Sequence, residues 1–317
     1  MKVRLGIDLG GTFIKAGIID SDAKILTRFK HPSEANDGPE KVIENLNIVY
    51  RKLLDICSQH DYQPLSIGIG SPGTIHQPDG KVTDATPNIP GWLGTVLTEV
   101  FDGCFIPVHA DNDANCVALA EYKVSYEARY QNMLFITIGT GIGGGIIIDG
   151  KLHRGSNYAA AEIGHTIIHH NGRLCKCGRK GCLEAYASVP NMMKRARHWA
   201  NHYRHKLPEK ITPEELYERF KKGNKIAKMT IIENAEYLGA GIGSFLNILN
   251  PQIVVIGGGF SGTGGDYLKL IETATKKYAF SEASRELVFA RAKMGNDAGF
   301  VGAALLGIVD GHNRIGQ

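Results

Sequence analysis

Two segments of this chain, far apart in the sequence, share the order of an apolar stretch, a glycine-rich turn and a second apolar stretch. The first begins with VRLGIDL (residues 3–9), and the second, NMLFITIGTGIGGGIIID, covers residues 132–149. Apolar and β-branched residues favour strands, and the glycines between them favour a tight turn. This weak internal repeat predicts two lobes that are built in the same way.

Strands and helices alternate along the rest of the chain. Apolar residues recur at helical spacing from Pro39 to about Cys57, and LSIGIGSPG (65–73) then reads as a strand. A further strand, FIPVHADND (105–113), runs into a helix that begins near Asn112, and IVVIGGG (253–259) is a buried strand. Alternation of this kind predicts an α/β fold.

The length of 317 residues suits one large domain or two lobes. We expect a first lobe of residues 1–118 and a second lobe of residues 119–298, with a C-terminal helix in 299–317 that packs back on the first lobe. No Pro/Ser-rich linker interrupts the chain. The two lobes are therefore expected to pack around a shared cleft.

Composition and charge exclude several classes of protein. A net charge of +4 is modest for this length and does not imply a nucleic-acid partner. The basic run Lys194–Lys206 reads as a solvated helix face, with an anion-binding patch as the alternative. No apolar segment approaches the roughly 20 residues that a membrane span needs, and the start of the chain lacks a signal-peptide pattern. We therefore expect a cytoplasmic protein with neither a membrane nor a nucleic-acid partner.

Three glycine turns follow buried strands, at residues 8–12, 137–145 and 255–259. Such turns let backbone N–H groups approach phosphate oxygens without interference from a Cβ atom. Each alone is equally explained as a tight hairpin. Three of them, the first two sharing a layout and the first carrying Asp8 at the end of its strand, favour nucleotide binding.

Two common phosphate motifs do not fit these turns. Gly139, Gly141 and Gly144 match G-x-G-x-x-G, but the following residues continue as a strand, whereas a dinucleotide site needs a helix there. The Walker pattern fails because Gly80-Lys81 and Gly150-Lys151 are followed by Val and Leu. The pattern is instead similar to the phosphate hairpins of actin, Hsp70 and hexokinase, which implies a two-lobed, ribonuclease H-like α/β fold.

Three polar residues, Asp111, Asn112 and Asp113, stand where a strand passes into a helix. One of them is enough to cap the helix. The other two suggest a ligand site, because ligands of α/β sheets bind at this end of the strands. A carboxylate there can accept the proton of an attacking hydroxyl while Mg²⁺ neutralises phosphate charge.

Three cysteines, Cys175, Cys177 and Cys182, lie within eight positions. A redox site would need an accessible C-x-x-C pair, and a treble-clef finger would need a second C-x2-C or an H-x3-5-H pair, neither of which is present. Three thiolates and one histidine can instead hold a structural zinc in a closed tetrahedron. The spacing leaves His165, His169 and His170 as rivals for the fourth ligand.

The ordered motifs DLGGT, SPG, TPNIPGW, NDAN, GTGIGGG, EIGH, CKCGRKGCLE and VIGGG closely resemble those of the ROK family of repressors, uncharacterised reading frames and sugar kinases. The resemblance covers nearly the whole chain and is greatest to bacterial ATP-dependent glucokinases. It implies an enzyme that transfers a phosphoryl group from ATP to the 6-hydroxyl of glucose.

The resemblance also implies roles for individual residues. Asp113 would be the general base, and Asp8 would position Mg²⁺ through water. The hexose would be bound by Gly73, Asn88, Asn112, Asp113, Glu162, His165 and Glu184. ATP would contact Gly10, Gly11, Thr12, Thr140, Gly141, Gly257 and Gly258. His165 would complete a structural Zn²⁺ site in a zinc-binding insertion of the second lobe at residues 165–182.

One residue departs from the family pattern, because Ala161 replaces the glycine that usually precedes EIGH. The extra methyl group raises a question about substrate preference more than about activity. The other hexoses that the family implies are N-acetylmannosamine, N-acetylglucosamine, fructose and allose, and the donor alternative is polyphosphate. Family members usually form homodimers or homotetramers.

A different class is also represented in the family, namely repressors that bind sugar as a signal. Those repressors carry a helix-turn-helix domain ahead of the first phosphate loop. Here that loop begins at residue 8, so we expect the kinase rather than the repressor.

Overall fold

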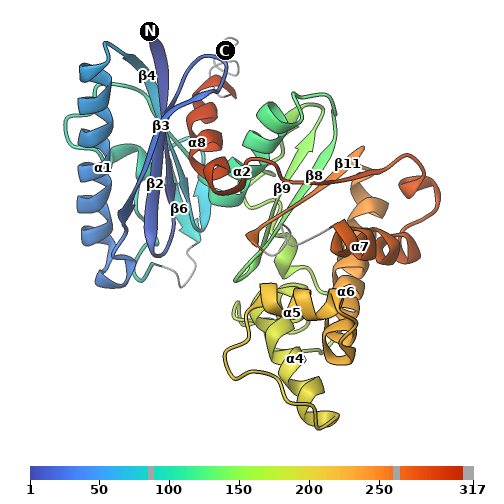
Figure 1. Cartoon of the computed structure of the whole chain (residues 1–317). Coiled ribbons are helices and arrows are strands. Elements are labelled where there is room, and N and C mark those ends of the chain that lie inside the picture. Colours follow the sequence, from blue (N-terminus) through green and yellow to red (C-terminus); the bar gives the residue numbers. More distant parts are fainter. Residues whose placement is uncertain (85–88, 260–264, 310–317) are drawn as a thin grey trace. The chain divides into compact units, whose positions relative to one another are not determined.

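The computed structural model describes residues 1–84, 89–259 and 265–309, which form two compact units (Figure 1). Unit 1 comprises Met1–Arg129, Leu152–Ala160 and Asn296–Gln317, and unit 2 comprises Tyr130–Lys151 and Ala161–Gly295. The boundary expected near residue 118 falls inside the helix α2 (Asp113–Ala120). The short segment 152–160 groups with unit 1, although the sequence patterns assign it to the second lobe.

Unit 1 is built on a five-stranded sheet with the order β3-β2-β1-β4-β7. Its strands are β1 (Lys2–Leu9), β2 (Phe13–Ile19), β3 (Ile25–Pro32), β4 (Gln63–Ser71) and β7 (Val108–Asn112). β1 and β2 form an antiparallel hairpin, whereas β4 runs parallel to both β1 and β7. A small second sheet pairs β5 (Thr74–His76) with β6 (Lys81–Asp84).

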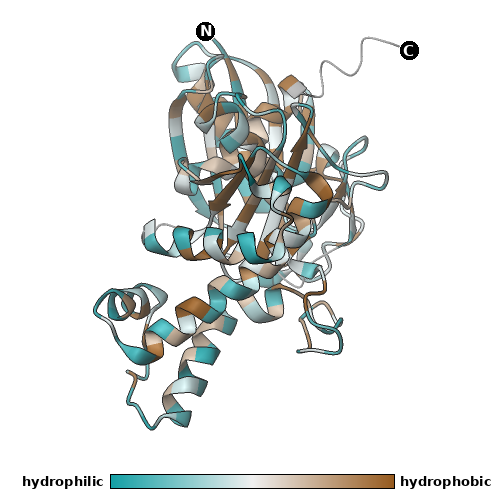
Figure 2. Cartoon of the chain, turned by 90° about the vertical axis from the view of Figure 1, so that its right-hand side faces the viewer, coloured by the Kyte–Doolittle hydropathy of each residue, from teal (hydrophilic) through white to brown (hydrophobic). Residues whose placement is uncertain are grey.

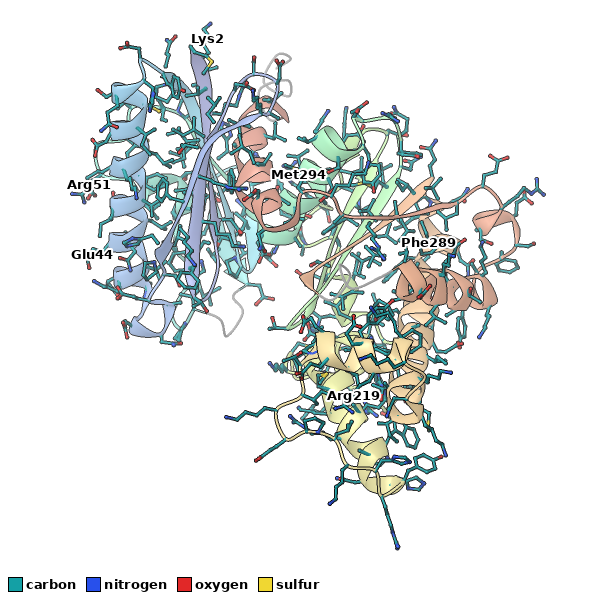
Figure 3. The ribbon with its side chains drawn as sticks, viewed as in Figure 1. Lys2, Glu44, Arg51, Arg219, Phe289 and Met294 are labelled. Atoms are coloured by element: carbon teal, nitrogen blue, oxygen red, sulfur yellow. The ribbon has the colours of Figure 1, made fainter. Side chains whose placement is uncertain are left out.

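Helices cover both faces of this sheet. α1 (Pro39–Gln59) lies on one face, and α2 and α8 (Ala298–Val309) lie on the other (Figure 1). The predicted helical spacing is confirmed, because Val42, Leu46, Val49 and Leu53 are buried. Glu44 and Arg51 point from α1 away from the sheet (Figure 3).

α8 approaches the sheet unusually closely. A Cβ atom on Gly6 would lie 1.8 Å from the carbonyl oxygen of Phe300, and one on Gly68 would lie 1.8 Å from that of Ala303. Gly6 and Gly68 are register partners on β1 and β4. The backbone of α8 thus packs directly on these two adjacent glycines. Any other residue at either position would clash with a carbonyl oxygen of α8.

Unit 2 repeats the topology of unit 1, with the strand order β10-β9-β8-β11-β12. The strands are β8 (Met133–Ile138), β9 (Ile142–Ile148), β10 (Lys151–Leu152), β11 (Ile253–Gly257) and β12 (Val288–Arg291). As in unit 1, an antiparallel hairpin (β8 and β9) is extended by parallel strands (β11 and β12). The internal repeat read from the sequence is therefore a repeat of sheet topology.

The helices of unit 2 are α3 (Glu184–Ala187), α4 (Val189–His202), α5 (Pro213–Lys221), α6 (Lys225–Leu249) and α7 (Gly265–Tyr278). α4 carries most of the basic run 194–206, and Lys194, Arg197 and His198 are exposed as expected of a solvated face. Arg195 is the exception. It is buried, and its guanidinium group donates to the Tyr186 carbonyl at 2.9 Å and to the Asn234 side chain.

Each unit has its own apolar core, centred on the strands of its sheet. Figure 2 shows the strands mostly brown, whereas the surface helices alternate between teal and brown. Within the described ranges, no helix combines the length and the apolar character that crossing a membrane would require.

Candidate functional site

The first two glycine turns are hairpin turns at corresponding places in the two sheets. The first glycine turn (residues 10–12) joins β1 to β2, and the second glycine turn (residues 139–141) joins β8 to β9. The turns are closed by hydrogen bonds from Gly10 N to Phe13 O, at 3.0 Å, and from Gly139 N to Gly141 O, at 2.9 Å. The predicted hairpins are thus present in both units.

The third glycine turn packs against the second within unit 2. Gly258 has φ +93°, and a Cβ atom there would lie 2.1 Å from the carbonyl oxygen of Ile138. Only glycine meets both conditions. The end of β11 therefore lies directly beside the end of β8, where the second glycine turn begins.

Asp8 stands at the end of β1, next to the first glycine turn. Lys15 is its register partner on β2, and the Nζ atom of Lys15 lies 3.5 Å from the Asp8 carboxylate. Burial raises the pKa of Asp8, and the charge of Lys15 partly offsets this. Lys15 was missed in the sequence, although symmetry of the hairpin about Gly11 and Thr12 places it opposite Asp8.

The β7–α2 junction (residues 111–115) forms a capped helix start. The side-chain oxygen of Asn112 accepts hydrogen bonds from Ala114 N (2.9 Å) and Asn115 N (3.2 Å), so Asn112 is the N-cap of α2. Its amide nitrogen donates to the carbonyl of Gly73 at 3.0 Å. One side chain therefore fixes both the start of α2 and the turn that holds Gly73.

Asp113 is the first residue of α2, where its carboxylate faces the positive end of the helix dipole. One carboxylate oxygen accepts a hydrogen bond from Ala114 N at 2.8 Å. The nearby Ser71 is fully buried, and its hydroxyl accepts a hydrogen bond from Trp92 Nε1 at 3.0 Å. Ser71 is thus committed to holding the turn, whereas Asp113 is half-buried.

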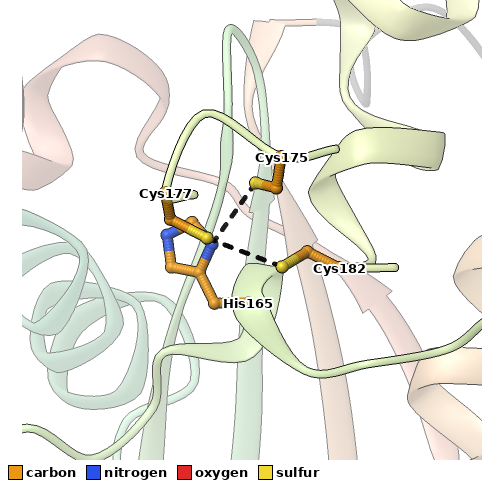
Figure 4. Close-up of side chains that lie close together, drawn as sticks. All are labelled: His165, Cys175, Cys177 and Cys182. Carbon is orange, nitrogen blue, oxygen red and sulfur yellow. Dashed lines mark hydrogen bonds between the residues drawn. The ribbon is translucent and has the colours of Figure 1, made fainter. Parts of the chain in front are cut away.

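The cysteine loop (residues 165–184) brings four potential metal ligands together (Figure 4). Each of His165, Cys175, Cys177 and Cys182 offers one ligand atom, and these atoms all lie within 4.8 Å of one another. Cys177 Sγ lies 3.6 Å from Cys182 Sγ, and Cys175 Sγ lies 3.8 Å from His165 Nδ1. Tetrahedral zinc with bonds of about 2.3 Å to sulfur has sulfur–sulfur edges of about 3.8 Å. The donor set and its spacing therefore fit a zinc ion.

The two rival histidines, His169 and His170, lie outside the cluster. The ring of His169 stacks on Tyr186 with centroids 6.0 Å apart, and its Nδ1 atom contacts the carbonyl of His170 at 3.0 Å. Among the three histidines, only His165 belongs to the cluster with the cysteines. Burial raises the pKa of the Cys182 thiol to about 12, so a bound cation is needed to hold it as a thiolate.

Glu184 connects the cysteine loop to the second glycine turn. One of its carboxylate oxygens accepts a hydrogen bond from Ile142 N at 2.9 Å, and the other lies 3.8 Å from Cys175 Sγ. A Cβ atom on Gly141 would lie 2.5 Å from this carboxylate. The contact was missed in the sequence, because the two partners are 42 residues apart.

Glu162 comes just before a single 3-10 turn, Ile163–His165, whose last residue is the candidate ligand. His165 N donates to the carbonyl of Glu162 at 3.0 Å. Ala161, which precedes it, has φ +68°, in the left-handed region that favours glycine. The departure from the family motif therefore lies at a position whose backbone suits glycine better than alanine.

The candidate residues fall into two groups, one in each unit. Unit 1 contains Asp8, Gly10, Gly11, Thr12, Gly73, Asn112 and Asp113. Unit 2 contains Thr140, Gly141, Glu162, His165, Cys175, Cys177, Cys182, Glu184, Gly257 and Gly258. Asn88 lies outside the described residues. Each group gathers around one glycine turn and the carboxylates near it.

Two sheets of one topology, each with a glycine hairpin, define a duplicated α/β protein of the phosphate-hairpin class. The sequence pattern of the ROK family matches residues 4–309. The chain therefore belongs to the ROK family.

The relatives include both enzymes and regulators. A glucokinase of Halalkalibacterium halodurans is 33% identical over 95% of this chain and 94% of its own length. A xylose repressor of Caldicellulosiruptor bescii is 30% identical over 96% of this chain and 78% of its own. The crystal structure of a Streptomyces griseus ROK glucokinase in complex with glucose and AMPPNP is 30% identical, with a TM-score of 0.79, 96% coverage of this chain and 98% of that one.

Proposed function

We propose that this chain is a hexokinase-type sugar kinase that transfers the γ-phosphoryl group of ATP to the 6-hydroxyl of glucose, with Asp113 as the general base. The observation that carries the proposal is the β7–α2 junction, where a carboxylate begins a capped helix at the end of a parallel strand. The glucokinase relative and the glucose and AMPPNP complex of the S. griseus enzyme support the substrates.

Phosphoryl transfer depends on positioning and charge neutralisation, and it needs no covalent nucleophile of the protein. Thr12 and Thr140, in the two glycine turns, are exposed residues and would meet the phosphates. Asp113 accepts the proton of the attacking sugar hydroxyl. Bound Mg²⁺ would neutralise phosphate charge, and Asp8 would hold it through water.

Sugar recognition requires several acceptors and donors for hydroxyl groups. We assign this role to Asn112, Glu162 and Glu184, with Gly73, Asn88 and His165 as further contacts. Asn112 uses its oxygen in capping and one amide N–H on the Gly73 carbonyl, so its second amide N–H is the group offered to the sugar. Glu184 uses one oxygen on Ile142 N, and its other oxygen, which lies 3.8 Å from the Cys175 thiol, would accept from the sugar once zinc holds Cys175 as a thiolate.

Zinc would be held by His165, Cys175, Cys177 and Cys182, and its role would be structural. Four protein ligands leave no position for a reacting water. His165 would use Nδ1 for the metal and leave Nε2 for a sugar hydroxyl. The ion would thereby fix the segment between Glu162 and Glu184, which are both proposed to bind sugar.

The deciding experiment is a coupled ADP-release assay over glucose, fructose, allose, N-acetylglucosamine and N-acetylmannosamine, repeated with polyphosphate as donor. We expect ATP-dependent turnover that is highest with glucose. Asp113→Asn should lower kcat by about 10²- to 10⁴-fold and leave glucose binding by calorimetry nearly unchanged. Asp102→Asn, which alters an exposed carboxylate of the same unit, is the control. Normal turnover in Asp113→Asn would refute the assignment of the base.

The similarity to a xylose repressor over 96% of this chain favours one alternative, sugar sensing without phosphoryl transfer. Sugar binding with no turnover on any donor would establish it. For the assembled protein we propose a homodimer or homotetramer, which light scattering on the purified chain tests.

A further inference from the structure

Asp111 is the most buried acid at the β7–α2 junction, with a side chain that is only 3% exposed. One carboxylate oxygen accepts hydrogen bonds from Asn112 N at 2.7 Å and from Asn115 Nδ2 at 2.9 Å. The other accepts the Nε–H of Arg154 at 2.6 Å. Both oxygens of this carboxylate are engaged by the protein, and the side chain is buried, so it is not offered to a substrate. Its function must therefore be exerted through its partners.

Arg154 reaches Asp111 from the segment 152–160, which groups with unit 1 although unit 2 flanks it on both sides. The guanidinium side chain is 13% exposed. Its loop is closed by a hydrogen bond from Ala160 N to Arg154 O at 3.0 Å, and the ring of Tyr158 packs edge-on against His76 at 4.9 Å. Arg154 and Tyr158 thus attach this segment to unit 1, two residues before Glu162.

The pKa of the buried Cys116 thiol in α2 shows which charged groups lie near the start of this helix. Burial raises the pKa of this thiol most, the carboxylates of Asp111, Asp8 and Asp113 raise it further, and Arg154 lowers it. Three acids and one guanidinium group are therefore concentrated around the first turn of α2.

The neighbouring elements add few other charges. Asp8 faces Lys15, and Asp297, just before α8, pairs with Arg28. Neither β4 nor the described side chains of α8 carry an ionisable residue, β7 adds His109, and the fully buried Glu121 comes just after the far end of α2. Arg154 is thus the cation that directly balances Asp111.

We propose that the Asp111–Arg154 pair is a positioning device for the general base Asp113, which holds the β7–α2 junction in place and cancels the charge of Asp111 beside the base. The proposal rests on the function proposed above. Neither residue touches the reacting atoms, so both act through Asp113 and Asn112.

Charge cancellation predicts shifts of opposite sign for the two halves of the pair. Asp111→Asn leaves the guanidinium charge unbalanced, which lowers the pKa of Asp113 and moves the acidic limb of the kcat/KM profile to lower pH. Arg154→Met leaves the carboxylate unbalanced, which raises the pKa of Asp113 and moves the limb to higher pH. We expect a shift of about one pH unit in each direction, the lower end of what a nearby charge produces at a carboxyl group.

The experiment measures kcat/KM for the best hexose against pH for the wild type, the two single variants, the double variant Asp111→Asn/Arg154→Met and Arg154→Lys. The double variant removes both charges and should bring the limb back to the wild-type position. Arg154→Lys keeps the positive charge, so the acidic limb should stay at the wild-type pH while kcat falls. Arg129→Met, which breaks an exposed ion pair with Glu127 in the same unit, is the control. Circular dichroism at each pH confirms that each variant remains folded.

Opposite shifts that cancel in the double variant establish the proposal. Equal losses of stability with an unmoved limb, or shifts of the same sign in both single variants, overturn it and leave a structural ion pair. If a single variant does not fold, the double variant decides. An acidic limb at the wild-type pH supports the proposal, and an acidic limb at a different pH overturns it. A wild-type protein that phosphorylates no hexose refutes the proposed function instead, so the two failures are distinguishable.

Discussion

The β7–α2 junction and the cysteine loop are both proposed to position groups for the same sugar, but they are stabilised in different ways. At the junction, Asp111 and Asn112 use their side-chain oxygens within the protein, on backbone N–H groups, an amide and a guanidinium group. In the cysteine loop, three thiols and an imidazole lie within 4.8 Å of one another, and the contacts between them are weak hydrogen bonds, such as those of 3.6 Å from Cys177 to Cys182 and 3.8 Å from Cys175 to His165.

This difference shows what each region needs in order to hold its shape. A network whose donors and acceptors are paired is rigid without any added group. A cluster of thiols instead gains its stability from a metal ion. Because the site does not exist in the unfolded chain, the free energy of metal binding adds directly to the free energy of folding. A chelator should therefore leave the stability of the junction unchanged and lower the stability of the cysteine loop.

Cys182→Ser should have the largest effect. Cys182 is fully buried, and loss of one thiolate removes much of a metal contribution that reaches about 10 kcal/mol in small zinc sites. We expect metal content to fall from about one zinc per chain, with a lower unfolding midpoint and low activity. Elemental analysis and thermal unfolding measure both. Cys104→Ser, a cysteine of unit 1 outside the cluster, is the control. A variant that stays fully active and equally stable without metal would contradict a structural role for the ion.

Asn112→Ala tests whether the stability of the β7–α2 junction is independent of metal. Removal of an N-cap costs about 1–2 kcal/mol, and here the hydrogen bond to the Gly73 carbonyl is lost as well. We expect this loss of stability in urea to be the same with and without chelator. Asn224→Ala is a matched control, because Asn224 caps α6 in unit 2 at a distance in sequence from every proposed site residue. Asn224→Ala should lose the cap contribution alone and Asn112→Ala somewhat more stability, but only Asn112→Ala should lose activity.

Local patterns account for what could be predicted at these sites. The glycine turns, the start of α2 and the cysteine cluster each depend on residues within about one element, so periodicity, capping preference and ligand spacing reveal them. The contacts that complete the sites are different. Arg154 meets Asp111 across 43 residues, and Glu184 meets Ile142 across 42. No local pattern contains such pairs, because they depend on how strands and loops pack.

The burial of Arg195 was missed for the same reason. In the sequence it is one of several basic residues on a helix, and only the fold shows that it faces Asn234 and the carbonyl of Tyr186. Lys15 differs from these cases, since the symmetry of the first hairpin is enough to pair it with Asp8. Register is thus predictable from a short turn, whereas packing between distant segments is not.

Gly141→Ala tests the link between the second glycine turn and the cysteine loop. The new methyl group would occupy the position of the Glu184 carboxylate, which would move and lose its hydrogen bond to Ile142 N. We expect a stability loss of about 1 kcal/mol and a higher KM for the hexose. Gly139→Ala is the control for packing, because a Cβ atom there meets nothing within 4 Å. Equal KM values for glucose in both variants would show that Glu184 does not depend on this turn.

Ala161→Gly should have the smallest effect, and it should be stabilising. None of residues 111–115 has a positive φ, whereas Ala161, at the entrance to the cysteine loop, has φ +68°. A left-handed conformation costs alanine about 1–2 kcal/mol, which glycine avoids. The greater conformational entropy of glycine in the unfolded chain offsets part of this stabilisation. We expect a net gain of about 0.5 kcal/mol in urea unfolding. Ala23→Gly removes the same kind of strain from a turn in unit 1, where φ is +61°. Equal gains in the two variants would assign the effect to backbone strain alone, whereas a change in hexose preference only in Ala161→Gly would tie this position to Glu162.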